Sequence, residues 1–209
     1  SNTARQKTES LFLKFSGLIQ DSTRLTKTRT ILGIDPGTNI LGFGIVRVNA
    51  ASKPEFVDMG VLDLRKASDS YEKLGIISEK VGALCDLHHP DDLAVESPFY
   101  GKNAQVILKL GRAQGAAMIA AISRGIPVFE YAPRKAKMAI CGNGAASKEQ
   151  VALIVEKTLG IDFASKYLDA TDALAIAMCH YYQLTSPLSS VSASTSWEKF
   201  VQANPGRVK

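Results

Sequence analysis

The chain has 209 residues, which suits one domain with tails, and 45% of them are hydrophobic, which is enough for a substantial core. Its 25 lysines and arginines exceed its 20 aspartates and glutamates, giving a modest net charge of +5 at pH 7. No apolar run reaches transmembrane length, and the three cysteines include no CxxC pair, which argues against membrane-spanning, disulfide-stapled and zinc-finger proteins. We therefore expect a cytoplasmic protein with no membrane partner.

The first half of the chain predicts three strands, a helix and a fourth strand. Residues 1–28 are expected to form a flexible N-terminal extension. Spacing of apolar residues predicts strands at 30–35, 41–49 and 55–64, which we expect to be antiparallel neighbours, then a helix at 71–88 and a short buried strand at 93–96.

The second half is mostly helical. A long helix rich in alanine, glycine and leucine is predicted at 103–124, and a fifth strand at 127–131. A short helix is expected from Pro133 to about residue 140, a second opens with the capping-box pattern Ser147 to Gln150, and a last core helix covers 169–183. Residues 185–209 read as a serine-rich linker and a short tail, which leaves 29–184 as the folded domain.

Three early strands followed by helices that alternate with two more strands predict an α/β fold. Its centre would be a five-stranded mixed sheet, flanked by helices on both faces. This is the element order of a ribonuclease H-like fold.

Four acidic residues lie next to apolar segments of the sequence that we expect to be buried, where a charged carboxylate costs free energy. Asp35 and Glu96 each end an apolar strand, and Asp169 and Asp172 open an otherwise apolar helix, three residues apart on one helix face. Gathered at one sheet edge, they would repel one another without a cation, and Mg²⁺ prefers carboxylate oxygen. A carboxylate-only Mg²⁺ site in a basic protein points to phosphodiester chemistry on nucleic acid.

Each acid also has a simpler interpretation. Asp35 precedes Pro36-Gly37 and could be a turn residue, and Glu96 could leave the sheet into solvent. Asp169 could cap the last helix, and Asp172 could complement its dipole. These interpretations are good one by one, but they do not explain why both strand-end acids follow such apolar strands.

Two basic stretches follow Glu96 and could frame the acidic site. No acid occurs from residue 97 to 129, and a second stretch continues into the predicted helices. An ordinary solvated surface is the alternative, but cations beside an acidic centre suit a nuclease that holds a phosphate backbone. The cations of the two stretches are Lys102, Lys109, Arg112, Arg124, Arg134, Lys135, Lys137 and Lys148.

At this point the residues resemble a known family. The segment Ile31-Leu-Gly-Ile-Asp-Pro-Gly-Thr38 and the segment Glu96-Ser-Pro-Phe-Tyr-Gly-Lys-Asn103 are similar to the acidic motifs of the RuvC family of bacterial Holliday junction resolvases. Further blocks match in the same order: Leu110-Gly-Arg-Ala-Gln-Gly115, Phe129-Glu-Tyr-Ala-Pro133, Lys148 and Asp169-Ala-Thr-Asp-Ala-Leu-Ala175. The resemblance covers roughly residues 29–183. It departs at Ser97-Pro98, where the family more often has a polar-aliphatic pair.

The resemblance implies a bacterial homodimer that binds a four-way DNA junction and cuts two opposed strands symmetrically. It implies two Mg²⁺ or Mn²⁺ ions per site on Asp35, Glu96, Asp169 and Asp172, with catalytic lysines at Lys137 and Lys148. It places an aromatic that stacks on junction bases at Phe99. Predicted DNA contacts are Phe99, Lys102, Asn103, Lys109, Arg112, Arg134, Lys135, Lys137 and Lys148. A branch-migration motor is a further expected partner. The helix at 103–124 is expected to form the dimer, and the sequence does not decide which face of the helix does so.

Other functions stay open at this stage. A catalytically silent junction-binding protein would share the fold, although all four acids are present. Another ribonuclease H-like nuclease could act on RNA or on a different branched DNA. An actin-like ATPase or sugar kinase is suggested by Gly33-Ile-Asp-Pro-Gly-Thr38, but the chain shows neither a second phosphate loop nor an adenosine motif.

Overall fold

The computed structural model describes residues 27–49, 53–98, 103–161 and 168–185. Residues 25–183 form one compact unit built on a mixed sheet. The described part of the chain contains five strands in the spatial order β3-β2-β1-β4-β5. They are β1 (Arg29–Asp35), β2 (Ile40–Val48), β3 (Glu55–Asp63), β4 (Asp92–Glu96) and β5 (Val128–Tyr131).

The predicted five-stranded mixed sheet and the antiparallel pairing of its first three strands are confirmed. β1 pairs antiparallel with β2, and β2 with β3, as the short connections predicted. β4 runs parallel to β1, and β5 runs parallel to β4, each after a helical crossover. Because β1 and β4 are parallel neighbours, their carboxyl ends, at Asp35 and Glu96, meet at the same edge of the sheet.

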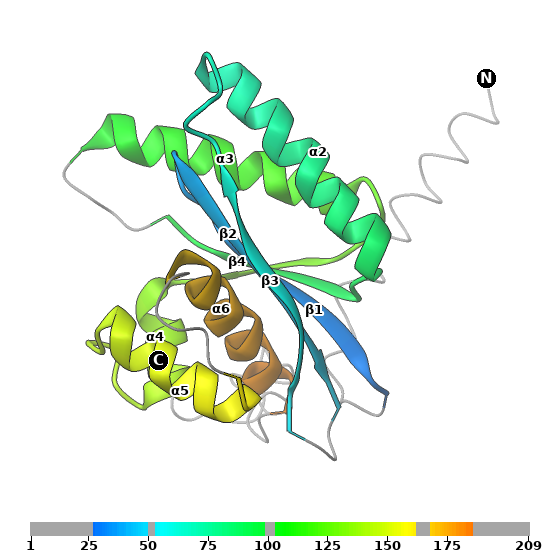
Figure 1. Ribbon diagram of the computed structural model, residues 1–209, viewed down its shortest axis with the longest axis vertical. Helices are drawn as coiled ribbons and strands as arrows, with labels where there is room; N and C mark the ends of the chain where they lie inside the picture. Colours follow the sequence, from blue (N-terminus) through cyan, green and yellow to red (C-terminus); the bar gives the residue numbers. More distant parts are fainter. Residues whose placement is uncertain (1–26, 50–52, 99–102, 162–167, 186–209) are drawn as a thin grey trace, which may run out of the picture. The chain divides into compact units, whose positions relative to one another are not determined.

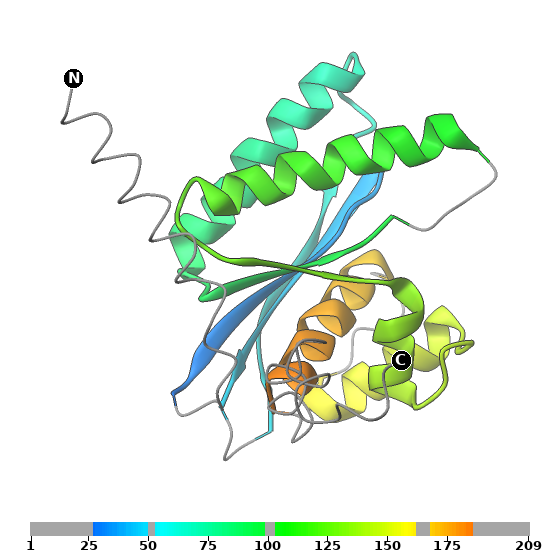
Figure 2. The same ribbon diagram turned by 180° about the vertical axis from the view of Figure 1, so that it is seen from behind.

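Helices cover both faces of the sheet, as predicted. Figures 1 and 2 show α2 and α3 together on one face and α4, α5 and α6 on the other. Their bounds are α2 (Ser70–His88), α3 (Ala104–Ile122), α4 (Pro133–Cys141), α5 (Lys148–Leu159) and α6 (Leu168–Thr185). None of these described helices combines the length and the apolar character needed to cross a membrane.

The α2–α3 face carries a continuous apolar core. Alternate residues of β1, Leu32 and Ile34, point to this side and pack with Ile77 of α2 and Ala117 of α3 in one buried cluster. Side chains alternate between the faces of a strand, so Gly33 and Asp35 must point to the other side. The strand therefore fixes the direction of the acid at its end.

The α6 face is built around glycines. Gly33 pairs with Gly44, and Asp35 pairs with Gly42 across the β1–β2 ladder. A Cβ added to Gly33 would lie 2.0 Å from the carbonyl oxygen of Ala173, and one added to Gly42 would lie 2.0 Å from that of Asp169. The backbone of α6 thus rests directly on the sheet, which side chains at these positions would prevent.

A buried polar chain ties α6 to the sheet and starts at Arg29 and Asp92, the ends of β1 and β4 away from the acids. Arg29 donates two hydrogen bonds to the carboxylate of Asp92, at 2.8 and 2.7 Å. The Nε2 of His180 lies 3.4 Å from the same carboxylate, and its Nδ1 lies 2.6 Å from the Tyr131 hydroxyl. Asp92 and His180 are each 1% exposed, and the Nε2 of His180 makes no hydrogen bond with any described residue, although it approaches the Asp92 carboxylate.

Candidate active site

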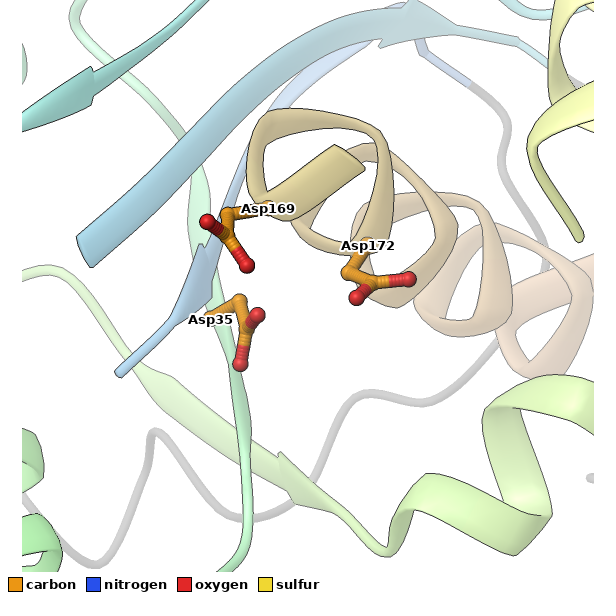
Figure 3. Close-up of side chains that lie close together, drawn as sticks. All are labelled: Asp35, Asp169 and Asp172. Atoms are coloured by element: carbon orange, nitrogen blue, oxygen red, sulfur yellow. The ribbon is translucent and has the colours of Figure 1, made fainter. Parts of the chain in front are cut away.

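Three separate elements bring the four acids together. Asp35 ends β1 and Glu96 ends β4, and the last paired residues before them, Ile34 and Val95, are directly opposite each other. Asp169 and Asp172 lie in the first turns of α6, which the glycine contacts hold against this part of the sheet. Figure 3 shows Asp169 and Asp172 projecting from the helix toward Asp35.

The carboxylates of Asp35, Asp169 and Asp172 form a compact cluster. One oxygen from each lies within 4.8 Å of the other two, a spacing that can hold a metal ion. Glu96 joins through a side-chain hydrogen bond to Asp35. It lines a pocket of about 240 Å³ together with Asp35, Asp172, Lys137 and Lys148. The sequence predicted this convergence, and the structure places all four acids at one edge.

Burial and mutual repulsion favour the protonated form of these carboxyls. Burial, with the nearby charge of Asp35 and the hydrogen bond to it, raises the pKa of Glu96 to about 9. Burial also raises the pKa of Asp35, to about 6, against the opposing effect of its hydrogen bond to Glu96. Burial raises the pKa of Asp172 as well, although Lys148 offsets part of that effect. Buried carboxyls that lie this close together favour binding of a cation, because the cation removes the repulsion between them.

Lys148 supplies one positive charge inside the cluster. It is the first residue of α5, directly after the Ser147 cap, and its ammonium forms an ion pair with Asp172. Its Nζ also lies 3.7 Å from an oxygen of Asp169. Burial opposes the charged form, but the bond to Asp172 and the surrounding carboxylates outweigh it and raise the Lys148 pKa.

Lys137 approaches the same pocket from α4. Its Nζ donates to the carbonyl oxygen of Ala146 at 2.7 Å, which fixes the side chain across the connection between α4 and α5. From there its charge acts on Asp172 and lowers that carboxyl's pKa in part. The two lysines predicted to be catalytic thus lie beside the acids, on different helices.

A buried glutamine that the sequence reasoning did not single out supports Glu96. Gln114 of α3 donates from Nε2 to the backbone oxygen of Glu96 at 3.3 Å and to Glu130 of β5 at 2.9 Å. It is 7% exposed, so it joins the ends of β4 and β5 from inside the α3–sheet contact. The sequence offered one signal for this role, since Gln114 is a polar residue within the mostly apolar segment 110–122.

The other predicted DNA contacts are scattered. Asn103 caps α3, accepting from the amides of Gln105 and Val106 at 3.0 and 3.3 Å. The Nζ of Lys135 lies 5.1 Å from the ring centre of Tyr131, and Arg134 packs over Gly144. Lys109 and Arg112 lie exposed on α3, in a hollow apart from the acids. Phe99 and Lys102 lie outside the residues that the structure describes.

The sheet is mixed and five-stranded, and helices cover both of its faces. Carboxylates lie at the ends of β1 and β4 and at the start of α6. This combination defines a nuclease of the ribonuclease H-like class. The family model for crossover junction endodeoxyribonuclease RuvC matches residues 31–180. The chain belongs to the RuvC family.

Relatives and solved structures agree with this assignment. The crossover junction endodeoxyribonucleases RuvC of Bacteroides fragilis and Christiangramia forsetii are 51% and 50% identical to the chain. Each alignment covers 88% of this chain, and 97% and 95% of the two relatives. Thermus thermophilus RuvC, in a complex with a Holliday junction substrate, superposes with a TM-score of 0.70 at 35% identity, covering 75% of this chain and 95% of that one.

A more distant structure shares the fold. The yeast mitochondrial Holliday junction resolvase gives a TM-score of 0.58 at 14% identity, covering 79% of this chain and 84% of that chain. The ribonuclease H-like prediction is therefore confirmed, and the ATPase and sugar-kinase interpretations are excluded by the family.

Proposed function

We propose that this chain resolves Holliday junctions in recombination and repair, by paired, symmetric phosphodiester cleavage of a four-way DNA junction. The observation that carries the proposal is the convergence of Asp35, Asp169 and Asp172 within 4.8 Å, beside Glu96, in a chain of the RuvC family. Crossover junction endodeoxyribonuclease is the activity named for its relatives in Bacteroides fragilis and Christiangramia forsetii.

We infer that Asp35, Glu96, Asp169 and Asp172 hold two Mg²⁺ or Mn²⁺ ions. Four carboxylates offer only hard oxygen donors, which suits these cations and not zinc or copper. The raised pKa values of Asp35 and Glu96 support the inference, since burial there is tolerable only if protons or metal ions balance the charge. When bound, two such ions activate a water for in-line attack on phosphorus and stabilise the leaving oxygen.

The chain's own residues would hold the scissile phosphate and shield its charge. Lys148 begins α5 and lines the pocket, so its ammonium and the positive end of the helix dipole would act together on an anion there. Lys137 is held by Ala146 at the pocket wall, where it could offset negative charge that develops on the phosphate. Asp35 belongs to the cluster and also contacts Glu96, so it would hold the ions together with the other three acids.

Incision of a synthetic four-way junction tests this function. With Mg²⁺, paired symmetrical nicks should appear in the junction and not in linear duplex or in an RNA–DNA hybrid. EDTA and the Asp35→Asn variant should both abolish the nicks, while junction binding persists. Tight binding without nicks would instead identify a silent junction-binding protein, and cleavage of the hybrid would indicate a ribonuclease.

We also propose a homodimer formed by the outward face of α3. The small residues Ala113, Ala117, Ala120 and Ala121 face the sheet and are buried. The opposite stripe carries Leu108 and Ile119, 57% and 55% exposed, with open space at Gly111 and Gly115 between them. Residues at this i, i+3, i+7, i+11 spacing share one helix face, and the glycines permit close approach of a second helix. A two-fold dimer would present two sites to two opposed strands.

Light scattering tests the dimer. Ile119→Asp should give a monomer, because it buries a charge in the proposed interface. Leu87→Asp, at an apolar residue of α2 that is also largely exposed, is the matched control and should leave the mass unchanged. A wild-type monomer on and off DNA would contradict the proposal.

Two further expectations rest on the family and remain proposals. A branch-migration motor as partner is supported only by the family resemblance. A cytoplasmic location is supported by the bacterial relatives and by the three free cysteines, Cys85, Cys141 and Cys179.

A further inference from the structure

A second hollow lies at the carboxylate end of the sheet, on the opposite face. It has a volume of about 430 Å³ and is lined by the β1–β2 turn, the connection from β3 to α2, and the facing sides of α2 and α3. We call it the turn hollow. It shares no lining residue with the carboxylate pocket, which is bounded by α4, α5 and α6. Figure 1 shows α2 and α3 on the opposite side of the sheet from those three helices.

The turn hollow is positively charged. Lys73 of α2 and Lys109 and Arg112 of α3 line it, with Asp69 as its acidic lining residue. The Asp69 carboxylate is already engaged as the cap of α2, accepting from the amides of Tyr71 and Glu72 at 2.7 and 2.8 Å. The balance in the hollow therefore favours an anion.

One of the three cations is fixed and two are available. The Nζ of Lys73 donates to the backbone oxygen of Thr38 at 2.8 Å and to the side-chain oxygen of Asn39 at 3.1 Å, which ties the turn to α2. Lys109 and Arg112 are exposed, three residues apart on one face of α3. Within the described ranges of one chain neither forms a hydrogen bond or an ion pair, so both can meet a ligand without breaking a contact inside that chain; Arg112 borders the stripe of α3 proposed for the dimer.

The arrangement suits a phosphodiester. An arginine fork matches two phosphate oxygens at once, and a neighbouring lysine adds a mobile point charge. The turn that forms one wall starts at Pro36, directly after Asp35. A phosphate in the turn hollow and one beside the carboxylates would thus lie on the two sides of the same turn, within reach of one branched DNA molecule.

We propose that the turn hollow binds a backbone phosphate of the junction other than the scissile one, through Arg112 and Lys109. The inference rests on the proposed function, because it takes junction DNA as the substrate. It adds a second anchoring point on the α2–α3 side, which sets the direction in which a DNA arm leaves the site.

The salt dependence of junction binding gives the first test. Binding is measured by fluorescence anisotropy in the Asp35→Asn background, which is expected to keep the DNA intact. Losing one phosphate contact should reduce the slope of log K against log salt by about 1, so Arg112→Ala should show that change. Its affinity at fixed salt should fall by roughly 10- to 150-fold, as expected for one charged hydrogen-bonding group. Arg112→Lys should keep most of the slope.

Arg47 supplies the matched control. It is an exposed arginine near the far end of β2, away from the turn. Arg47→Ala removes the same charge from another part of the same domain, so it measures the effect of net charge alone. If Arg112→Ala and Lys109→Ala change slope and affinity no more than Arg47→Ala does, the turn hollow is not a phosphate site.

The second test identifies the phosphate. Single phosphates around the crossover are replaced by neutral methylphosphonates, and each junction is titrated with the Asp35→Asn protein and with the same protein carrying Arg112→Ala. At one non-scissile position, neutralisation should weaken binding of the first protein and have little further effect on the second. Equal losses for both proteins at every position would overturn the inference.

Kinetics separate this inference from the proposed function. In the otherwise wild-type chain, Arg112→Ala should raise the KM for junction incision and leave kcat at saturating junction unchanged, because the carboxylate pocket is intact. A wild-type chain that cuts no junction would contradict the proposed function itself. A cutting enzyme whose Arg112→Ala variant loses kcat, or shows an unchanged KM, would contradict only the phosphate site.

Discussion

Gly42 of β2 lies directly against the backbone of Asp169, so that a Cβ added to the glycine would approach the aspartate's carbonyl oxygen to 2.0 Å. Gly42 also pairs with Asp35 across the ladder. One glycine thereby sets the distance between the strand that carries the first acid and the helix that carries two others. This close approach makes the site sensitive to a single methyl group.

Gly42→Ala is expected to destabilise the fold and to reduce incision strongly, because α6 must move away from the sheet. The cost should be roughly 1–3 kcal/mol of the free energy of unfolding, typical of overpacking. Gly75→Ala is the matched control, since Gly75 lies in α2 with nothing within 4 Å of an added Cβ. That change should stabilise the protein by up to about 1 kcal/mol through helix propensity. Urea unfolding and junction cleavage measure both, and equal stability of the two variants would contradict this reading.

Lys148→Gln should lower the rate of junction cleavage and also destabilise the metal-free protein. The ammonium that offsets Asp172 and Asp169 is lost, and glutamine leaves those carboxylates facing one another. Mg²⁺ should restore most of the lost melting temperature without restoring the rate. Lys157→Gln, in the last turn of the same helix, is the control and should change neither quantity. A Lys148→Gln enzyme with normal kcat would exclude a catalytic role for the lysine.

The metal-free protein should lose stability as the pH rises. The pKa of Asp35 is raised from 3.8 to about 6, and that of Glu96 from 4.5 to about 9, so the folded state holds protons that the unfolded chain releases. Their contribution is complete below about pH 4 and disappears as the pH rises through 6 toward 9. Mg²⁺ displaces these protons, so its stabilising effect should grow over the same range.

Melting temperatures in EDTA and in Mg²⁺ between pH 5 and pH 9 test this linkage. Glu96→Gln should flatten the dependence in EDTA at its alkaline end, because the carboxyl that holds the proton there is gone. A gap between the EDTA and Mg²⁺ curves that stays constant with pH would show that the carboxyls carry no extra protons.

His180→Ala should lower the free energy of unfolding by roughly 2–4 kcal/mol, because it leaves a cavity and removes a buried partner from Tyr131 and Asp92. Tyr131→Phe removes only the hydroxyl and should cost about 1 kcal/mol. The double variant should lose less than the sum of the two, since both changes break the same bond. Denaturant unfolding measures the cycle, and strict additivity would mean that the two side chains are not coupled.

The sequence predicted the strands and the acids well, for a shared physical reason. Short apolar runs that end in a carboxylate, such as the one before Asp35, indicate buried strands that reach an exposed edge. The capping box from Ser147 to Gln150 is confirmed, since both reciprocal hydrogen bonds are present. Local patterns of this kind depend on a few neighbouring residues, so they can be read from a single chain.

Contacts between distant segments were not predictable in the same way. Gly42 and Gly44 look like ordinary strand glycines until α6 is placed on them. The bond of Lys148 to Asp172 joins residues 24 apart in the chain. Asn103 has a structural role that its position before a helix already favoured, because its side chain caps α3, and its predicted contact with DNA stays a prediction.

The order of the elements also governs when during its synthesis the chain can acquire a complete set of four acids. Asp35 and Glu96 leave the ribosome early, on β1 and β4, but Asp169 and Asp172 arrive with α6, whose start at Leu168 follows every other described element. An unfinished polypeptide, or one cut short before this helix, holds only half of the acids. Nuclease activity would thus be withheld until translation of the domain is almost complete, without any inhibitor.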